Sequence, residues 1–378
     1  MIGRIALGGG IATAAAAGVG WAIARRLTAP AGPRTFDLTI RAVEHDDRGD
    51  LIVLDRTDQT TAPGIYNLWF EHGRWAQLST EIVDRGPTRV ARRITDAAPG
   101  FTPKTGDRTS WSGIYYATPA DAGLHARDIT ITTPAGRRPA WRIDGDPSTW
   151  AIHIHGLGST RAGTLRGALA TTELGYTSLV VSYRNTTEGP RVGTGRTTLG
   201  HTETTGVDEA IGYAVRRGAR QIVLFGWSMG AAIALQLADH PRHQGLIAGL
   251  VLDSPVLDWA EVIKTNCARS GLPAAAGHLA IPWLTLHPLA RALGLPGRIP
   301  LRSFDWTTRT ADLTTPTLIL HGTRDDSVPI RLSQALRDAR PDLVELETVD
   351  ASHTLCWHTD PDRWQKTVTT WLRSRVPH

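Results

Sequence analysis

The chain is poor in the residues that build metal centres and disulfide frameworks. Its 378 residues include two cysteines, Cys267 and Cys356, whose spacing matches neither a pair of metal ligands nor a disulfide framework. The two thiols are either free or paired with each other, and the sequence leaves both possibilities open. A phosphate-binding P-loop and a glycine fingerprint for a dinucleotide are both missing from the sequence. We therefore expect no cofactor and no bound metal.

Long runs of positive charge are also missing. Lysine occurs only at Lys104, Lys264 and Lys366, so most of the positive charge comes from arginines that are scattered among aspartates. The formal net charge is +5, yet no stretch contains five or more basic residues in succession. This distribution is typical of a solvated surface and not of a nucleic-acid-binding site. We expect no nucleic-acid partner.

An uncharged run of twenty residues, from Ile5 to Ala24, lies near the N-terminus between Arg4 and the pair Arg25-Arg26. Twenty residues at the helical rise span about 30 Å, the thickness of the hydrocarbon core of a bilayer. We interpret residues 1–34 as a hydrophobic segment plus a linker. A single retained membrane anchor is the favoured interpretation, and a cleaved signal peptide of a secreted protein is the alternative. The side of the membrane is left open, because the flanking arginines favour a cytoplasmic domain whereas many single N-terminal anchors leave their domain outside.

The rest of the chain divides into two patterns of apolar residues. Residues 35–127 carry short alternating runs separated by aspartate, glycine and proline, which is typical of small β-strands. We expect a β-rich accessory region there with a structural role, and a substrate gate is the alternative. Over residues 128–378, continuous apolar strands alternate with amphipathic helices. This alternation predicts a mostly parallel sheet with helices on both faces, in which chemistry gathers at the carboxyl ends of the strands.

The stretch Gly226-Trp227-Ser228-Met229-Gly230 lies at one of these strand ends. The apolar run 220–227 predicts a buried strand and the run from Met229 predicts a helix, so Ser228 falls on a sharp strand-to-helix turn. Glycines on either side of Ser228 fit this turn, because side chains there would collide with the turned backbone. A serine between two glycines is not specific in a chain with 38 glycines. Its position between a strand and a helix indicates a nucleophile.

A serine hydroxyl needs a base and an acid to become a nucleophile, and the chain supplies both further along. Asp325 lies in the turn after the apolar run TLIL, and His353 lies in a loop after the next predicted strand. Serine, acid and histidine in this order, each at its own strand end, predict a catalytic triad of Ser228, Asp325 and His353. Asp253, at the end of another predicted strand, is the alternative acid, and Asp326 is the neighbour most easily confused with Asp325.

The glycine-rich stretch HIHGLGSTR, at residues 153–161, follows the first long buried strand. We predict that its turn presents the backbone amide of Leu157 to a developing oxyanion, with the amide of Met229 as the second donor. His155 in the same stretch invites assignment as a base or a metal ligand. A histidine that is packed behind the loop and hydrogen-bonded to backbone is the favoured interpretation.

Together these motifs resemble those of the α/β-hydrolases. From about residue 128 onward the chain is most similar to bacterial serine hydrolases of the prolyl-oligopeptidase, acylaminoacyl-peptidase-like and BEM46-like group. The stretches that carry the resemblance are HGLGSTR, SYRN, LGHTETTGVDEAIGYA, GWSMG, VLDSPVLDW, HGTRDDSVP and ASHT. The resemblance implies an α/β-hydrolase fold in which Ser228, Asp325 and His353 match the family's serine, aspartate and histidine. It is not specific to a substrate, because this fold hosts many reactions.

About sixty residues, 255–315, separate two of the predicted strands of the catalytic region 128–378. They are helix-prone and apolar, with Trp283 and Leu284 among them, and they predict a helical cap that could also line a hydrophobic pocket. The leading hypothesis is a serine hydrolase that cleaves carboxylic esters of small molecules through an acyl-enzyme. Short peptides or aminoacyl amides are the alternative substrates. A catalytically silent hydrolase fold that serves as a binding module is the third hypothesis.

Overall fold

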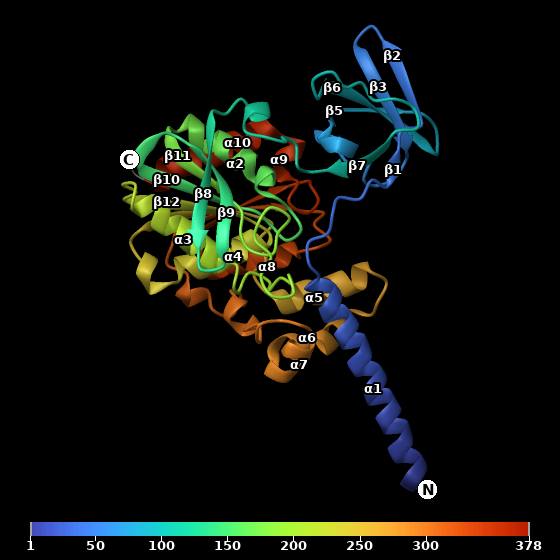
Figure 1. Cartoon of the computed structure of the whole chain (residues 1–378), viewed down its shortest axis with the longest axis vertical. Helices are drawn as coiled ribbons and strands as arrows, with labels where there is room; N and C mark the ends of the chain where they lie inside the picture. Colours follow the sequence, from blue (N-terminus) through green and yellow to red (C-terminus); the bar gives the residue numbers. More distant parts are fainter. Residues whose placement is uncertain (1, 377–378) are drawn as a thin grey trace.

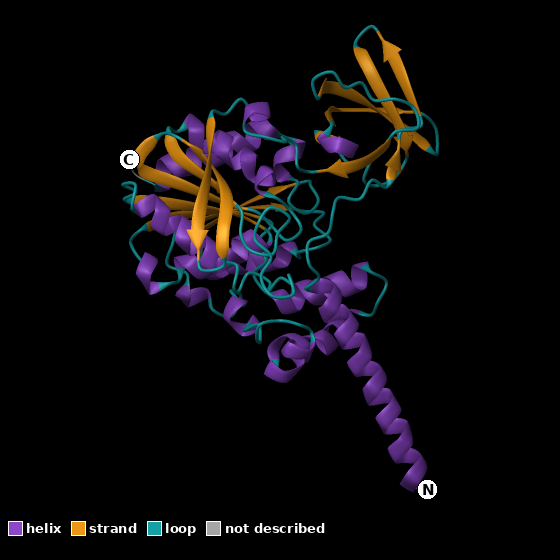
Figure 2. Ribbon diagram, viewed as in Figure 1, coloured by secondary structure: helices purple, strands orange, loops and turns teal. Residues whose placement is uncertain are grey.

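The computed structural model describes residues 2–376, which form two β-sheets with most of the helices gathered around the second sheet (Figures 1 and 2). The first sheet has seven strands in the order β1-β7-β4-β5-β6-β3-β2, and its paired strands are antiparallel. The strands are β1 Leu38–Thr39, β2 Ala42–Asp46, β3 Gly49–Asp55, β4 Tyr66–Phe70, β5 Trp75–Asp84, β6 Arg89–Ala97 and β7 Arg108–Ser112. This antiparallel sheet has a small apolar core of its own, which includes Ile52, Leu54 and Leu68.

The second sheet has eight strands in the order β15-β14-β13-β12-β10-β11-β9-β8. The strands are β8 Ala126–Thr133, β9 Gly136–Ile143, β10 Asp146–Ile154, β11 Tyr176–Val181, β12 Gln221–Trp227, β13 Ile247–Asp253, β14 Thr317–Gly322 and β15 Val344–Val349. The six strands from β10 to β15 pair in parallel, and the hairpin β8–β9 adds antiparallel to β11. The sheet is thus mostly parallel, as the alternation of strands and helices predicted.

Helices cover both faces of the second sheet. One face carries α3 Thr204–Val215, α4 Met229–Ala238 and α8 Ile330–Ala339, and the other carries α2 Leu165–Glu173, α9 Cys356–Thr359 and α10 Pro361–Arg375. Successive strand residues point to opposite faces, and for this reason Leu224 belongs to one core whereas Val223 and Phe225 belong to the other. Because both faces are buried, the strands read as continuous apolar runs in the sequence.

The insert between β13 and β14 is helical, with α5 Trp259–Arg269, α6 Gly277–Thr285 and α7 His287–Ala292. Leu284 is buried in the core on this side of the sheet. Trp283 donates a hydrogen bond from Nε1 to the carbonyl of Ala17, at 3.1 Å. Helix α6 therefore packs both on the core of the second sheet and on an N-terminal helix, so the insert connects that helix to the catalytic region.

That N-terminal helix, α1 Ile2–Leu27, packs against α6 at its carboxyl end and projects away from the body along the rest of its length (Figure 1). Arg196 fixes the end of α1 by donating to the carbonyl of Arg25 at 2.7 Å and to the hydroxyl of Thr28 at 3.1 Å. The run 5–24 was predicted to be a membrane anchor or a signal peptide, and part of it lies outside the residues whose side chains are described. Within the described part of the chain, no helix combines the length and the apolar character needed to cross a membrane.

Arg92 of β6 fixes the loop that joins β3 to β4 within the first sheet. Its side chain is fully buried and donates to the carbonyls of Thr60 and Ala62 at 3.1 Å, of Gly64 at 2.7 Å and of Ser79 at 2.9 Å. Three of these bonds hold the loop 60–64 in place, and the fourth goes to the neighbouring strand β5. Directly after this loop, the amide of Ile65 donates to the carbonyl of His358 in α9, at 2.9 Å.

We expect Arg92→Met to lower the free energy of unfolding by roughly 3–5 kcal/mol, because four carbonyl acceptors, two of them in buried hydrogen bonds, would lose their donor. Denaturant unfolding followed by tryptophan fluorescence measures the change. The matched control is Arg89→Met on the same strand, since the Arg89 side chain is partly exposed and pairs with Asp55 at the surface. A surface pair of this kind contributes about 1 kcal/mol or less. Equal stabilities of the two variants would contradict this account of Arg92.

Candidate active site

Ser228 lies at the point where β12 ends and α4 begins, with no residue of a loop between them. Its backbone is in an uncommon conformation, with φ 53° and ψ −113°. A non-glycine residue with positive φ costs conformational energy, and such residues often occur at functional turns. The turn lifts the Ser228 hydroxyl to the carboxyl edge of the parallel strands, which is the position of a nucleophile elbow.

The two glycines that flank the elbow have a steric role. A Cβ atom at Gly226 would lie 2.5 Å from the Cα of Ala231, and a Cβ at Gly230 would lie 2.1 Å from the carbonyl oxygen of Ile154. Both distances are far below a normal contact between nonbonded atoms. Larger residues at these two positions would force the strand and the helix apart, so the glycines make the sharp turn possible.

His353 makes the two hydrogen bonds that connect the elbow to an acid. Its Nε2 lies 3.0 Å from Ser228 Oγ, and its Nδ1 lies 2.7 Å from Asp325 Oδ2. With the proton on Nδ1, the ring donates to the carboxylate and accepts from the hydroxyl. The structure therefore brings together the three residues that their order in the sequence singled out. Their geometry suits transfer of the serine proton to the imidazole.

The carboxyl group of Asp325 is fully buried and well supplied with hydrogen-bond donors. Its Oδ1 accepts from the amides of Ser327 at 2.9 Å and of Val328 at 2.8 Å, while Nε2 of His321 lies 3.2 Å from Oδ2. Burial alone would raise the pKa of Asp325, but the hydrogen bonds to His321, His353 and Val328 outweigh burial and hold this pKa well below its usual value. The group is therefore a carboxylate at neutral pH and can orient the His353 ring.

The two alternative acids lie in different surroundings. The side chain of Asp326 is 63% exposed and pairs with Arg269 at 3.1 Å. Asp253 is buried at the end of β13, and burial raises its pKa. The described residues show no hydrogen bond between the carboxyl group of Asp253 and the His353 ring, whose Nδ1 is bonded to Asp325. Asp325 is thus the acid that the structure places on His353.

The loop after β10 lies against the elbow, where the sequence predicted two amide donors. A Cβ atom at Gly156 would lie 3.3 Å from the Cβ of Ser228, so the chain from Gly156 to Leu157 passes directly beside the serine. Met229 begins α4 next to Ser228. These positions are compatible with the predicted oxyanion hole, formed by the amides of Leu157 and Met229.

His155 is packed behind this loop. Its Nδ1 lies 2.9 Å from the carbonyl oxygen of Gly156, and its ring stacks on Tyr183 with the ring centres 4.3 Å apart. Burial lowers the pKa of His155 to about 4, so the ring is neutral at physiological pH. The prediction of a packed histidine hydrogen-bonded to backbone is confirmed, and His155 is not a base for Ser228.

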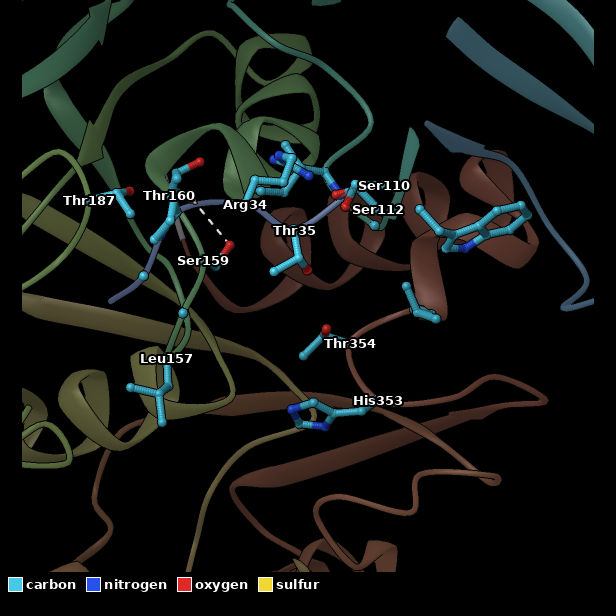
Figure 3. Close-up of a pocket in the computed structure, with 18 of the residues that line it drawn as sticks. Arg34, Thr35, Ser110, Ser112, Leu157, Ser159, Thr160, Thr187, His353 and Thr354 are labelled. Carbon is cyan, nitrogen blue, oxygen red and sulfur yellow. Dashed lines mark hydrogen bonds between the residues drawn. The ribbon is translucent and has the colours of Figure 1, made fainter. Parts of the chain in front are cut away.

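A cavity of about 780 Å³ opens beside His353 (Figure 3). Four segments that are far apart in the sequence contribute to its wall, namely residues 32–35, 110–114, 157–160 and 353–355. The first of these follows α1, and the second includes the end of β7 in the antiparallel sheet. The accessory region therefore lines the cavity next to the predicted catalytic histidine.

Sequence reasoning missed two histidines that support this site. His321 is the second-last residue of β14 and contacts Asp325. In the sequence, its position beside Gly322 at the end of a predicted strand is the one local feature that could have indicated this role. His358 is buried in α9, and its Nε2 lies 2.7 Å from the carbonyl oxygen of Gly113. No local pattern could have revealed His358, because its partner is 245 residues away in the sequence.

The residues that could hold a metal or form a disulfide are dispersed. Cys267 and Cys356 are both buried and unpaired in the structure. Of the two possibilities that the sequence left open, the structure therefore has the two free thiols and not the disulfide. No group of three or more His, Cys, Asp or Glu side chains in the described residues has a geometry that could hold a metal ion.

A mostly parallel sheet with a serine elbow, followed along the chain by an acid and a histidine, defines the class of α/β-hydrolases. This chain belongs to the α/β-hydrolase family, because the family model described as "Alpha/beta hydrolase family" matches residues 151–365, more than half of its length. It is therefore a hydrolase by family. The antiparallel sheet corresponds to a second match, at residues 39–112, to a domain of unknown function called DUF8805.

Solved structures of esterases share this fold. An esterase of Pyrococcus furiosus superposes with a TM-score of 0.53 at 21% sequence identity, over 69% of this chain and 95% of that one. An esterase from Rhodococcus gives a TM-score of 0.45 at 20% identity, over 67% of this chain and all of the other. No curated protein matches the chain. At 21% identity, the similarity to the Pyrococcus furiosus esterase establishes the fold of the catalytic region and leaves its substrate open.

Proposed function

We propose that the protein hydrolyses carboxylic esters by way of an acyl-enzyme on Ser228, with His353 as the base and Asp325 as its partner. The observation that carries the proposal is the pair of hydrogen bonds on the His353 ring, 3.0 Å to Ser228 Oγ and 2.7 Å to Asp325 Oδ2. Serine, histidine and carboxylate in this geometry activate a hydroxyl group that is otherwise a poor nucleophile.

In the first half-reaction, Ser228 Oγ attacks the ester carbonyl carbon while its proton passes to His353 Nε2. The carbonyl oxygen becomes an oxyanion, to which the amides of Leu157 and Met229 would donate. His353 then gives the proton to the departing alcohol, and the acyl group stays on Ser228. The carboxylate of Asp325 keeps the ring in the required tautomer and stabilises its charged form.

In the second half-reaction, water replaces the alcohol. His353 takes a proton from the water as its oxygen attacks the acyl carbon, and the same oxyanion donors stabilise the second tetrahedral intermediate. The proton returns to Ser228 Oγ when the bond to the acyl group breaks. The products are a carboxylic acid and the unchanged enzyme, so no cofactor takes part in the cycle.

Esters are favoured over peptides with a free amino terminus by the charge of the cavity. A peptidase that reads a free α-amine needs a carboxylate near the nucleophile to pair with it. Among the described residues that line the cavity, none is an aspartate or a glutamate, and two are arginines. A substrate ammonium group would meet like charge there. The resemblance to acylaminoacyl-peptidase-like enzymes thus gives the alternative function and not the leading one.

The test is a panel of p-nitrophenyl acetate, butyrate and octanoate beside p-nitroanilides of alanine and leucine. We expect saturable hydrolysis of the esters, with kcat/KM above that of the anilides. Faster hydrolysis of the anilides would overturn the ester proposal in favour of aminoacyl-amide hydrolysis. A folded protein that turns over neither series and is not labelled by a fluorophosphonate probe would be a binding module.

A further inference from the structure

The wall of the cavity beside His353 is rich in hydrogen-bond donors. The described residues that line it include Arg34 and Arg166 but no acidic residue. Seven others carry a hydroxyl group, and all seven are labelled in Figure 3. Guanidinium and hydroxyl groups are hydrogen-bond donors, and the guanidinium stays charged at any physiological pH. The wall therefore offers charged and neutral hydrogen-bond donors, and none of its described residues is a carboxylate that could accept from them.

Arg166, in the first turn of α2, is the more deeply buried of the two arginines, with 7% of the residue exposed. Its guanidinium lies 5.3 Å from the ring centre of Trp227, and one terminal nitrogen lies 3.4 Å from Nδ1 of His358. Burial is the main cause that lowers the pKa of His358 well below its usual value, and the positive charge of Arg166 lowers it further. His358 is therefore a neutral partner and does not balance the charge of Arg166.

The polar groups around Arg166 do not satisfy all the N–H donors of its guanidinium. Its Nε has no hydrogen-bond partner within the described part of the chain. The carboxyl group of Asp253 acts on Arg166 through space, but no hydrogen bond joins these two groups in the described part of the chain. A buried guanidinium without a bonded carboxylate is costly unless a further group completes it. Because Arg166 lines the cavity, a ligand in the cavity can supply that group.

Arg34 approaches the cavity from the linker that follows α1. Arg34 is an exposed residue, and its guanidinium lies 4.6 Å from the ring centre of Trp69. No carboxylate of the described chain forms a hydrogen bond or an ion pair with it. Figure 3 shows Arg34 on one side of the cavity and His353 on the opposite side. A molecule that spans the cavity from His353 would therefore meet the second cation at its far end.

We infer that this cavity binds a carboxylate group of the substrate, with Arg34 and Arg166 as the residues that recognise it. The inference rests on the ester hydrolysis proposed above and names the class of ester, one whose acyl or alcohol part carries a carboxylate. Arginine pairs with carboxylates through two parallel N–H···O bonds, and such charge-assisted bonds are stronger than neutral ones. The hydroxyl groups on the wall supply further donors.

The experiment compares two matched pairs of substrates at pH 7. Mono-p-nitrophenyl suberate against p-nitrophenyl octanoate places the carboxylate on the acyl part. The acetate ester of 4-hydroxybenzoate, against the acetate ester of its methyl ester, places the carboxylate on the alcohol part. We expect kcat/KM to be about 10- to 100-fold higher for the carboxylate member of one pair, mainly through KM. The pair that shows the preference identifies which part of the substrate lies against the arginines.

Variants assign the preference to the two side chains. Arg34→Gln should reduce the ratio of the two kcat/KM values several-fold, and Arg166→Lys, which keeps the charge but loses the planar fork, should reduce it as well. The matched control is Arg217→Gln, because Arg217 lies before β12 at the amino edge of the sheet, opposite the site, and contacts Tyr213. The ratio should be unchanged in that variant.

The outcomes separate this inference from the proposed function. If the neutral esters are hydrolysed as well as the carboxylate esters in both pairs, the carboxylate site is wrong while ester hydrolysis stands. The same conclusion follows if a preference exists but Arg34→Gln and Arg166→Lys, both folded by circular dichroism, keep it in full. If no ester of any kind is hydrolysed by folded enzyme, the proposed function itself fails.

Discussion

Ser228→Ala is expected to lower kcat for ester hydrolysis by about 10⁴-fold or more and to abolish labelling by a fluorophosphonate probe. The reason is that the Oγ atom of Ser228 forms the covalent bond to the acyl group, and no other group can take its place on the elbow. The fold should survive, because the hydroxyl makes its hydrogen bond to His353 and contributes nothing else that the turn requires. Activity and labelling are measured on the same preparation, together with the midpoint of thermal unfolding.

The control for this prediction is Ser303→Ala. Ser303 is an exposed serine of the insert, and its hydroxyl donates to the carbonyl of Pro300 at 2.7 Å. We expect full labelling and full activity from this variant. If the Ser228→Ala protein were still labelled to the level of wild type, the nucleophile would be a different residue and the assignment of the elbow would be wrong.

Asp325→Asn is expected to lower kcat by about 10⁴-fold, the scale of loss when the acid of a serine–histidine–aspartate triad becomes an amide. An asparagine carries no charge to stabilise the imidazolium, and its amide group favours the wrong tautomer of His353. The hydrogen bonds of Oδ1 with Ser327 and Val328 can persist, so the loop should keep its shape. Steady-state kinetics separates the expected fall in kcat from any change in KM.

Asp326→Asn is the matched control, because it makes the same chemical change one residue further along the chain. Its side chain points to solvent and pairs with Arg269, so activity within about twofold of wild type is expected. Asp253→Asn completes the set. A large fall in kcat for Asp253→Asn with a nearly silent Asp325→Asn would show that the acid has been misassigned.

The elbow could be predicted from the sequence because its determinants are local. The strand 221–227 and the helix that follows it are encoded by runs of apolar residues, and the turn between them by two glycines. The same local logic predicted His155 as a packed residue. From the sequence, the acid of the triad could be assigned only as a ranked set of candidates. Asp253 ends one buried parallel strand and Asp325 lies in the turn after another, so both lie at the edge of the sheet where the acid is expected.

The surroundings of the site could not be predicted, because they depend on contacts between distant segments. The wall of the cavity joins residues 32–35, 110–114 and 353–355, which no periodicity links to one another. Arg34 and Arg166 are ordinary arginines in the sequence. Both line one cavity only in the folded chain, in which the antiparallel sheet contacts the segment after His353 through bonds such as that between Ile65 and His358.

The sequence by itself determined the class of the fold, the position of the serine and the order of its partners. These features follow from strand and helix periodicity and from turn residues, which act over a few positions of the chain. Only the tertiary structure decided that Asp325 rather than Asp253 contacts His353, and that the accessory region and the linker after α1 line the cavity. The physical reason is that hydrogen-bond partners and cavity walls are set by the packing of whole elements, and this packing brings together side chains that are far apart along the chain.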